Sequence, residues 1–487
     1  MRYGVKIVLL MLFCCGCALQ KAHSSGPFQA SGIKIGEVTD TEAIIWTRLS
    51  AGPRRLGTDA PMPRVSYDGR KKKGKNRPDA GAVVAFPGGS IAETLEGAVG
   101  GTTGRVRVLY KAQTGGSWKQ TDWRPVDPQK DYTRQFRLTN LSPKTKYLVR
   151  IESQADNGGK GQTIEGGFRT APGPDRAEKV VFTVSTGQYY PDQDVPGGGY
   201  KIYGQMLKLD PDFFVHTGDI LYYDKLAKAK SLPLARRHWW RMYSLPTNVE
   251  FHRQVASYFM KDDHDTWKND CWPTMKGKDM GDFTFKQGQA VFLEQVPMGE
   301  KTWRTYRWGK DLQIWLVEGR DFRSPNPMPD GPDKTIWGKQ QKRWFKRTVA
   351  ESDATFKILI SPTPIVGPDR TKKNDNHANK GFTHEGDELR QFISKQKNMY
   401  VVCGDRHWQY VSQHAETGVR EYCCGPASNE HAGGWKNSMR YPEHKYLNVT
   451  GGFLAGTVER KDGKPTLTFR HYSVDGKILN EDRLPAE

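Results

Sequence analysis

Residues 212–222 read DFFVHTGDILY, and this stretch decides the fold class. Its apolar run, FFV, is typical of a buried strand, and the Gly-Asp pair after it is typical of a turn. A second apolar run, residues 180–184, lies upstream, and a helical stretch that ends near Leu209 separates the two runs. Residues 180–216 therefore predict a strand, a helix and a second strand of an α/β unit.

The same pattern recurs in the second half of the chain. Trp337, Phe345 and Val349 lie on one helical face. After them come a strand-like run, a helical stretch and another strand-like run, at residues 356–360, 389–393 and 400–403. We therefore expect residues 178–487 to form an α/β domain in which helices flank a layered sheet, with ligand sites just beyond the carboxyl ends of strands.

Residues 28–172 show a different pattern, with short alternating strands separated by Gly, Asp, Asn and Pro. The segment LSPKTKY at residues 141–147 resembles the turn before a late strand of a fibronectin type III sandwich, in which the tyrosine packs inward and its hydroxyl bonds to the backbone. We expect an all-β, fibronectin- or immunoglobulin-like sandwich domain here, with an insertion near residues 53–104. Within it, the basic block at residues 70–77 is expected to be a solvated loop, and residues 171–175 are expected to be a linker.

The composition limits the class of protein. The chain has 487 residues and a formal net charge of +20, with 36% apolar and 11% aromatic residues, which excludes a disordered, a collagenous and a polytopic membrane protein. A basic protein attracts anions of many kinds, so charge alone does not identify the partner. We expect a monomer without a specific nucleic-acid partner.

Residues 1–24 are typical of a secretory signal peptide. Arg2 and Lys6 come before an apolar run, residues 7–13, that is too short to cross a bilayer. We therefore expect an exported protein in the periplasm, on the cell surface or outside the cell, with Cys17 as a candidate lipidated residue for membrane anchoring. The remaining cysteines are too few for a disulfide scaffold but leave one bridge open: Cys271, Cys403, Cys423 and Cys424.

Acidic and imidazole side chains gather where predicted strands end. One strand runs into HTGD, which ends at Asp219, DDHD occupies residues 262–265, and a late strand runs into GDRH at residues 404–407. Hard oxygen donors together with imidazole suit a divalent or trivalent metal, and three aspartates within four residues repel one another unless a cation offsets their charge. The motifs together predict a metal site, although DDHD alone is also compatible with a solvated acidic patch.

The order GD, DDHD and GDxH resembles the metallophosphoesterase superfamily, and most closely its alkaline phosphatase D (PhoD-like) branch. The fibronectin-like start, HTGDILYY, and the segments KND, GRDFR and GDRHW fall in the order of that family, at residues 216–223, 268–270, 319–323 and 404–408. The resemblance covers most of the chain. It implies a metal-dependent phosphoric ester hydrolase, either an alkaline phosphatase or a phosphodiesterase.

The resemblance also implies roles for individual residues. By this resemblance, Asp219 would be a ligand that bridges two metal ions, and Tyr222 would be a phenolate ligand. The other implied metal ligands are Asp263, Asn269, Asp405 and His407. His264 would act near the leaving group or a phosphoryl oxygen, and Arg320 would bind phosphate oxygens, with an ion pair inside the fold as the alternative for Arg320.

One position departs from the family pattern. Gly187 stands where the family usually places a cysteine that ligates iron. We therefore expect a cluster of divalent or trivalent metal ions with Ca²⁺ as the first candidate, and Fe³⁺ is doubtful. The other histidines are expected mostly at the polar surface, although His431 could line the cleft beside its Gly-rich stretch: His377, His384, His414, His431 and His444.

The expected function is that of an exported phosphatase that hydrolyses phosphate monoesters, diesters or both through a metal-activated water. The alternative is a surface-binding protein on the same fold whose enzyme domain has lost its metal, and Gly187 is the residue that suggests it. The motif residues argue against this alternative, because the chain keeps Asp219, Asp263, Asp405 and His407.

Overall fold

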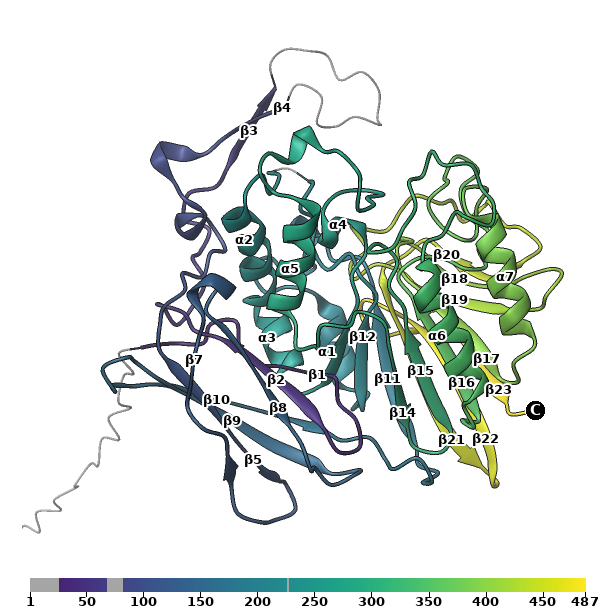
Figure 1. Ribbon diagram of the computed structural model, residues 1–487, viewed down its shortest axis with the longest axis horizontal. Coiled ribbons are helices and arrows are strands. Elements are labelled where there is room, and N and C mark those ends of the chain that lie inside the picture. The colour runs from purple at the N-terminus through teal and green to yellow at the C-terminus, as the bar shows by residue number, and fades with distance from the viewer. Residues whose placement is uncertain (1–25, 68–81, 226) are drawn as a thin grey trace, which may run out of the picture.

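The computed structural model describes residues 26–67, 82–225 and 227–487, and its strands and helices form stacked layers (Figure 1). The expected signal peptide, the candidate lipidated Cys17 and the basic block at residues 70–77 lie outside the described residues. Among the described residues, no helix is both long enough and apolar enough to span a membrane.

The N-terminal strands form two sheets, and apolar side chains of both sheets pack in one buried cluster. One sheet has the order β1 (Lys34–Gly36), β2 (Ala43–Arg48), β8 (Thr133–Leu138). The other has the order β10 (Lys160–Arg169), β9 (Lys146–Gln154), β5 (Arg105–Ala112), β6 (Lys119–Gln120), and β5 also pairs with β7 (Arg124–Pro125). The hydroxyl of Tyr147 accepts a hydrogen bond from the backbone nitrogen of Ser142 at 2.8 Å, so the tyrosine-anchored turn expected from the sequence is confirmed.

The insertion near residues 53–104 packs on a helix from the second half of the chain. It contains the hairpin β3 (Arg64–Tyr67) and β4 (Ala82–Ala85) and the 3-10 helices η1 (Pro87–Gly89) and η2 (Ala92–Thr94). Ala92, Ala98 and Val99 of the insertion form a buried cluster with Trp240 of α2 (Leu232–Tyr243). The other 3-10 helices are η3 (Pro128–Lys130), η4 (Tyr190–Asp192) and η5 (Lys278–Met280).

The first large sheet contains the 212–222 stretch. Its order is β13 (Ala256–Phe259), β12 (Phe213–His216), β11 (Val180–Ser185), β21 (Gly452–Lys461), β22 (Lys464–Ser473), β23 (Ile478–Pro485). Strands β11, β12 and β13 are parallel, whereas the other neighbours are antiparallel. Its outer face is covered by α2 and by α1 (Lys201–Leu207), α3 (Pro246–His252) and α5 (Phe285–Gln295), as Figure 1 shows.

The second large sheet has seven strands. Its order is β14 (Arg304–Trp308), β15 (Leu312–Leu316), β16 (Phe356–Ser361), β17 (Met399–Cys403), β19 (Arg420–Cys424), β18 (Gln409–Gln413), β20 (His444–Asn448). Strands β15, β16, β17 and β19 are parallel. Its outer face is covered by α6 (Gly338–Ala350) and α7 (Thr383–Ser394).

The inner faces of the two large sheets share one apolar core. Val184 and Val215 of the first sheet belong to the same buried cluster as Ile358 and Val402 of the second. The layers are therefore helix, sheet, sheet, helix, and this arrangement confirms the layered α/β fold. Each sheet contains several parallel strands, so the carboxyl ends of these strands lie at the same edge of the sheet. Residues that follow the strands can therefore place their side chains together at that edge.

The N-terminal sandwich is continuous with this core. Ile35 of β1 belongs to the same buried cluster as the large sheets, and Trp46 Nε1 donates a hydrogen bond to the Glu294 carbonyl of α5 at 2.9 Å. The division into residues 28–172 and residues 178–487 remains our proposal, because buried contacts cross it.

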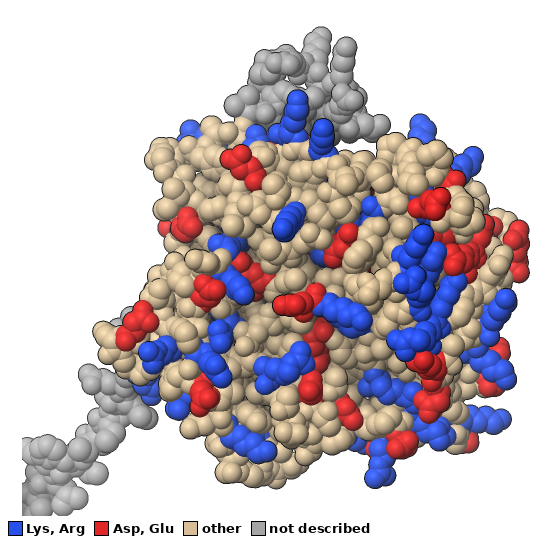
Figure 2. Space-filling view, in the orientation of Figure 1, with Lys and Arg blue, Asp and Glu red and all other residues tan. Residues whose placement is uncertain are grey.

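The four cysteines that the structure describes are buried and free, so the disulfide bridge left open by the sequence does not form among them. On the surface, Figure 2 shows Lys and Arg side chains interspersed with Asp and Glu over one face of the molecule. On that face the excess positive charge does not form one continuous basic patch.

Candidate metal centre

Asp219 is placed by the turn that follows β12. Gly218 has a φ of +108°, and a Cβ atom there would lie 2.6 Å from the backbone nitrogen of Asp262, so only glycine fits between the two loops. Asp219 itself adopts a left-handed φ of +55°, which non-glycine residues rarely do. The backbone nitrogen of Ile220 donates to Asp265 Oδ2 at 3.0 Å and fixes the turn.

Asp405 is placed in a similar way after β17. Its φ is +63°, and its backbone nitrogen donates to Thr186 Oγ1 at 3.3 Å. Gly404 packs so closely that a Cβ atom there would lie 2.4 Å from Thr217 Oγ1. Each of these aspartates thus sits in a sparsely populated backbone conformation beyond a strand end, which is where functional side chains are often held.

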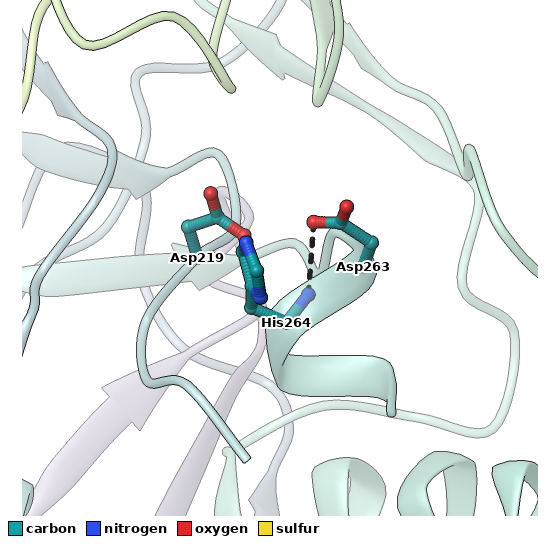
Figure 3. Close-up of side chains that lie close together, drawn as sticks. All are labelled: Asp219, Asp263 and His264. Carbon is teal, nitrogen blue, oxygen red and sulfur yellow. Dashed lines mark hydrogen bonds between the residues drawn. The ribbon is translucent and has the colours of Figure 1, made fainter. Parts of the chain in front are cut away.

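The DDHD segment divides into two structural and two cavity-facing residues. Asp262 caps α4 (Asp263–Thr266), and its backbone nitrogen donates to Asp265 Oδ1 at 2.6 Å. Asp263 and His264 instead face the cavity. In Figure 3 the Asp219 carboxylate lies against the His264 ring, and the Asp263 carboxylate points toward them from the first turn of α4.

His264 is held by a buried carboxylate. Its Nδ1 atom lies 2.6 Å from Asp224 Oδ1, and the other oxygen of Asp224 accepts a hydrogen bond from the Asn269 nitrogen at 3.0 Å. Burial lowers the pKa of His264, but the negative charges of Asp224 and Asp263 outweigh burial and raise that pKa to about 9. Asp224 thus orients the ring and favours its charged form.

Tyr222 joins Asp219 to two histidines. The Tyr222 hydroxyl lies 3.3 Å from Asp219 Oδ2, 3.2 Å from His407 Nε2 and 2.7 Å from His431 Nε2. His431 comes from the loop after β19, and its other ring nitrogen, Nδ1, lies 3.0 Å from Asp192 Oδ2 at the end of η4. Oxygen and nitrogen donors from three separate segments therefore meet at one hydroxyl.

The donor set fits metal ions. Ligand atoms of Asp219, Asp263 and His264 lie within 4.8 Å of one another, and so do those of Asp219, Asp262 and Asp405. Oδ1 of Asp219 and Oδ2 of Asp262 are buried and accept no hydrogen bond from the described residues. Burial and the neighbouring carboxylates Asp263, Asp262 and Asp265 raise the pKa of Asp219 well above its ordinary value. Cations would satisfy these oxygens and offset this repulsion.

A cavity of about 330 Å³ opens over these ligand atoms. Besides the expected site residues, Lys225, Arg370 and Lys373 line it. Lys373 Nζ lies 3.0 Å from Asp270 Oδ1 and 2.8 Å from Asp375 Oδ2, so its ammonium group is held in place. The cavity therefore combines an acidic floor with basic walls, which suits an anion bound next to metal ions.

Seven of the eight residues expected from the sequence line this one cavity: Asp219, Tyr222, Asp263, His264, Asn269, Asp405 and His407. Arg320 does not belong to the lining of the cavity. Its side chain is fully buried, and its Nε atom donates to Asp262 Oδ1 at 2.6 Å. This position corresponds to the ion-pair alternative, in which Arg320 orients Asp262 inside the fold.

Sequence reasoning missed several residues of the site. Asp224 and the basic residues Lys225, Arg370 and Lys373 carry no motif that marks them. The expectation of an exposed histidine is wrong for His377, which is fully buried with Nε2 2.9 Å from Glu385 Oε2. His431 lines the cavity, and the Gly-rich stretch after it was its signal.

The comparisons with known proteins agree with this geometry. The family model of the PhoD-like phosphatases matches residues 182–451. The structure of PhoD covers 95% of this chain and 90% of its own, with a TM-score of 0.70 and 15% identity. A purple acid phosphatase from yellow lupin (Lupinus luteus) seeds covers 93% of this chain and 74% of its own, with a TM-score of 0.63 and 12% identity. No curated protein matches the sequence. The family match spans more than half of the chain and contains every residue of the site, so the chain belongs to the PhoD-like phosphatase family and is a phosphoesterase.

Proposed function

We propose that this protein is an exported, metal-dependent hydrolase of phosphate monoesters and diesters that attacks phosphorus with a metal-activated water. The observation that carries the proposal is a group of buried carboxylate oxygens that accept no hydrogen bond from the described residues and lie beside imidazoles, under a cavity lined by basic side chains. The family supports a phosphatase, whereas the ester class, the metal and the export belong to the proposal.

The residues that would hold the metal ions come from the segments after three strands, β12, β13 and β17. They are Asp219, Tyr222, Asp263, Asn269, Asp405 and His407. Bound metal ions would supply two things here, a more acidic water and positive charge next to the phosphoryl oxygens. We take a cluster with Ca²⁺, and with iron as a second candidate, as the starting hypothesis for its identity.

The basic walls would hold the phosphate group. Arg370 and Lys373 face the same cavity as the carboxylates, and Lys225 lines this cavity near His264. Their charges would offset the negative charge that the equatorial oxygens carry in the transition state. Lys373 is held by Asp270 and Asp375, so it would bind without losing much conformational freedom.

His264 would protonate the leaving group. The bond between phosphorus and the leaving oxygen breaks, that oxygen takes the proton of His264, and water supplies the new oxygen on phosphorus. Asp224 holds the Nδ1 side of the ring, which leaves the rest of the ring facing Asp219 and the cavity. The same water returns a proton to the imidazole before the next turnover.

A second hollow next to the cavity supports a diester substrate. It measures about 650 Å³ and shares Arg370, Lys373 and Gly434 with the cavity. Its other walls are formed by basic, apolar and aromatic side chains and one threonine: Thr371, Lys372, Trp435, Lys436, Met439 and Tyr441. A monoester would leave this hollow unused, whereas the second alcohol of a diester would extend into it.

We also propose that the protein is exported through residues 1–24, that Cys17 anchors it, and that the chain is monomeric.

Metal analysis and assays with p-nitrophenyl phosphate and bis(p-nitrophenyl) phosphate test the proposed enzyme activity. We expect Asp219→Ala to lose bound metal and activity together while it stays folded, and Asp333→Ala, an exposed control, to keep both. A metallated and active Asp219→Ala protein would contradict the assignment of the metal site. A wild type inactive on both esters with Ca²⁺ and iron supplied would instead favour the surface-binding alternative.

A further inference from the structure

We propose that His431 is a metal ligand, and that it forms a site for a first-row transition metal together with Tyr222, His407 and Asp219. The inference rests on the proposed metal dependence and assigns this chain its own ligand at the position where the family cysteine is missing.

The other three proposed ligands surround the Tyr222 hydroxyl. The Tyr222 hydroxyl lies within 3.3 Å of a donor atom of each of the other three residues, and its shortest contact, 2.7 Å, is to His431 Nε2. The rings of His407 and His431 lie 4.1 Å apart between centroids. Two imidazoles and a carboxylate thus surround one phenol hydroxyl, and His407 Nε2 also lies 3.9 Å from Asp219 Oδ2. Small side-chain movements would let these donor atoms close on one ion.

The orientation of His431 is fixed by Asp192. The carboxylate of Asp192 lies 3.0 Å from Nδ1, so in the neutral ring the hydrogen on Nδ1 is donated to it and the lone pair of Nε2 faces Tyr222. A carboxylate that orients a ligand histidine through its far nitrogen is a recurrent part of metal sites. Asp192 is therefore a positioning residue for His431.

The space around Gly187 explains why His431 can take this place. Gly187 has a φ of +52°, and a Cβ atom there would lie 3.4 Å from Cδ2 of His431 and 3.5 Å from Cδ2 of His407. A side chain at residue 187 would point at both rings, and an Sγ atom would have to share their volume. Without a side chain there, the ring of His431 reaches the ligand group.

The donor chemistry identifies the class of ion. Imidazole nitrogen suits zinc, iron, cobalt and other first-row transition metals, whereas Ca²⁺ takes oxygen ligands. Two histidines in one set, His407 and His431, therefore favour a transition metal at this position. Ligand oxygens of Asp262 and Asp263 also lie within 4.8 Å of an Asp219 carboxylate oxygen, in groups that include neither His407 nor His431, and they would suit a hard ion.

Binding of Co²⁺ to the metal-free full chain tests the assignment, because Co²⁺ reports its ligands by visible absorption. We expect His431→Ala to weaken Co²⁺ binding more than 10-fold and to change the visible spectrum, and Asp192→Asn to weaken it about 10-fold with His431 still present. His384→Ala, at a position outside the site, is the control. Thermal unfolding checks that each variant is folded, and Asp192→Asn decides the test if His431→Ala does not fold.

Equal Co²⁺ affinity and identical spectra in wild type, His431→Ala and Asp192→Asn would overturn the assignment, whatever the activity. The proposed function is judged separately. If His431→Ala loses Co²⁺ but the metallated wild type hydrolyses neither p-nitrophenyl ester, the ligand assignment stands and the proposed function fails.

Discussion

The imidazole of His264 and the carboxylate of Asp224 form a buried pair, with Nδ1 and Oδ1 2.6 Å apart. Forty residues separate the two in the chain, and His264 lines the cavity together with Asp405 and His407. Because Asp224 also accepts a hydrogen bond from the Asn269 backbone, one carboxylate fixes a proposed proton donor and the loop of a proposed metal ligand.

The first prediction concerns this pair. Asp224→Asn is expected to lower kcat about 100-fold for an alkyl phosphate ester, because the alkoxide needs a proton as it leaves. For p-nitrophenyl phosphate, whose leaving group is stable as an anion, the loss is expected to be less than about 10-fold. Steady-state kinetics with both esters measure the difference. An equal loss with both esters would mean that Asp224 holds the loop rather than the proton donor.

The second prediction concerns the hollow beside the cavity. Tyr441→Ala is expected to raise KM for bis(p-nitrophenyl) phosphate about 5-fold, the loss of roughly 1 kcal/mol of aromatic contact, with KM for p-nitrophenyl phosphate unchanged. Tyr441 is 38% exposed and lines only the hollow. The control is Phe322→Ala, at a similarly exposed aromatic residue outside this hollow. A parallel change in both KM values would contradict a separate place for the second ester group.

The third prediction concerns Gly187. In the His431→Ala background, Gly187→Cys is expected to create a thiolate ligand, because the removed ring leaves the volume that Sγ needs. The measurement is the absorption of the Co²⁺-loaded double variant, which should gain an intense band from thiolate to metal in the near ultraviolet. Gly187→Cys with His431 in place should show a weaker band, since ring and sulfur compete. No band in the double variant would show that residue 187 does not reach the ion.

The fourth prediction is a pH effect remote from the metal centre. Glu385 is 1% exposed, and its Oε2 atom accepts a hydrogen bond from the Ile336 nitrogen at 2.6 Å and lies 2.9 Å from His377 Nε2. Burial raises the pKa of Glu385, but its hydrogen bonds and the charge of His377 lower that pKa to about 2. The folded protein therefore binds fewer protons here than the unfolded chain, and the carboxylate stabilises it above the unfolded pKa.

Glu385→Gln is thus expected to lower the free energy of unfolding at pH 7 by about 2 kcal/mol. This difference should shrink as the pH falls below about 4.5 and approaches the folded pKa of Glu385. The wild-type carboxylate becomes protonated in this range, and the stabilisation that its charge provides is lost. Denaturant midpoints of both proteins at pH 7 and pH 4 give the comparison. A difference that grows at pH 4 would contradict the sign of the shift.

Local sequence signals predicted the strand ends and the residues directly after them. The Gly218-Asp219 and Gly404-Asp405 pairs are readable because a strand, a glycine and an acid follow one another in the chain. The role of Arg320 could not be settled in this way, because a buried ion pair and an exposed phosphate contact use the same side chain and differ only in burial.

Partners that meet only through the fold gave no sequence signal. His431 and Asp192 are 239 residues apart, and nothing near either residue indicates that a loop after β19 packs against η4. The contact of Ala98 and Val99 with Trp240 is similar, since small apolar residues in an insertion do not specify the helix that they cover.

The hydrogen bond from Trp46 to the Glu294 carbonyl and the buried cluster that includes Ile35 have a practical consequence. The sandwich covers apolar surface of the α/β layers. A shortened protein that begins at residue 178 would therefore expose this apolar surface to solvent. Such a fragment should aggregate into inclusion bodies. The full-length protein should unfold thermally in a single transition rather than as two separate domains.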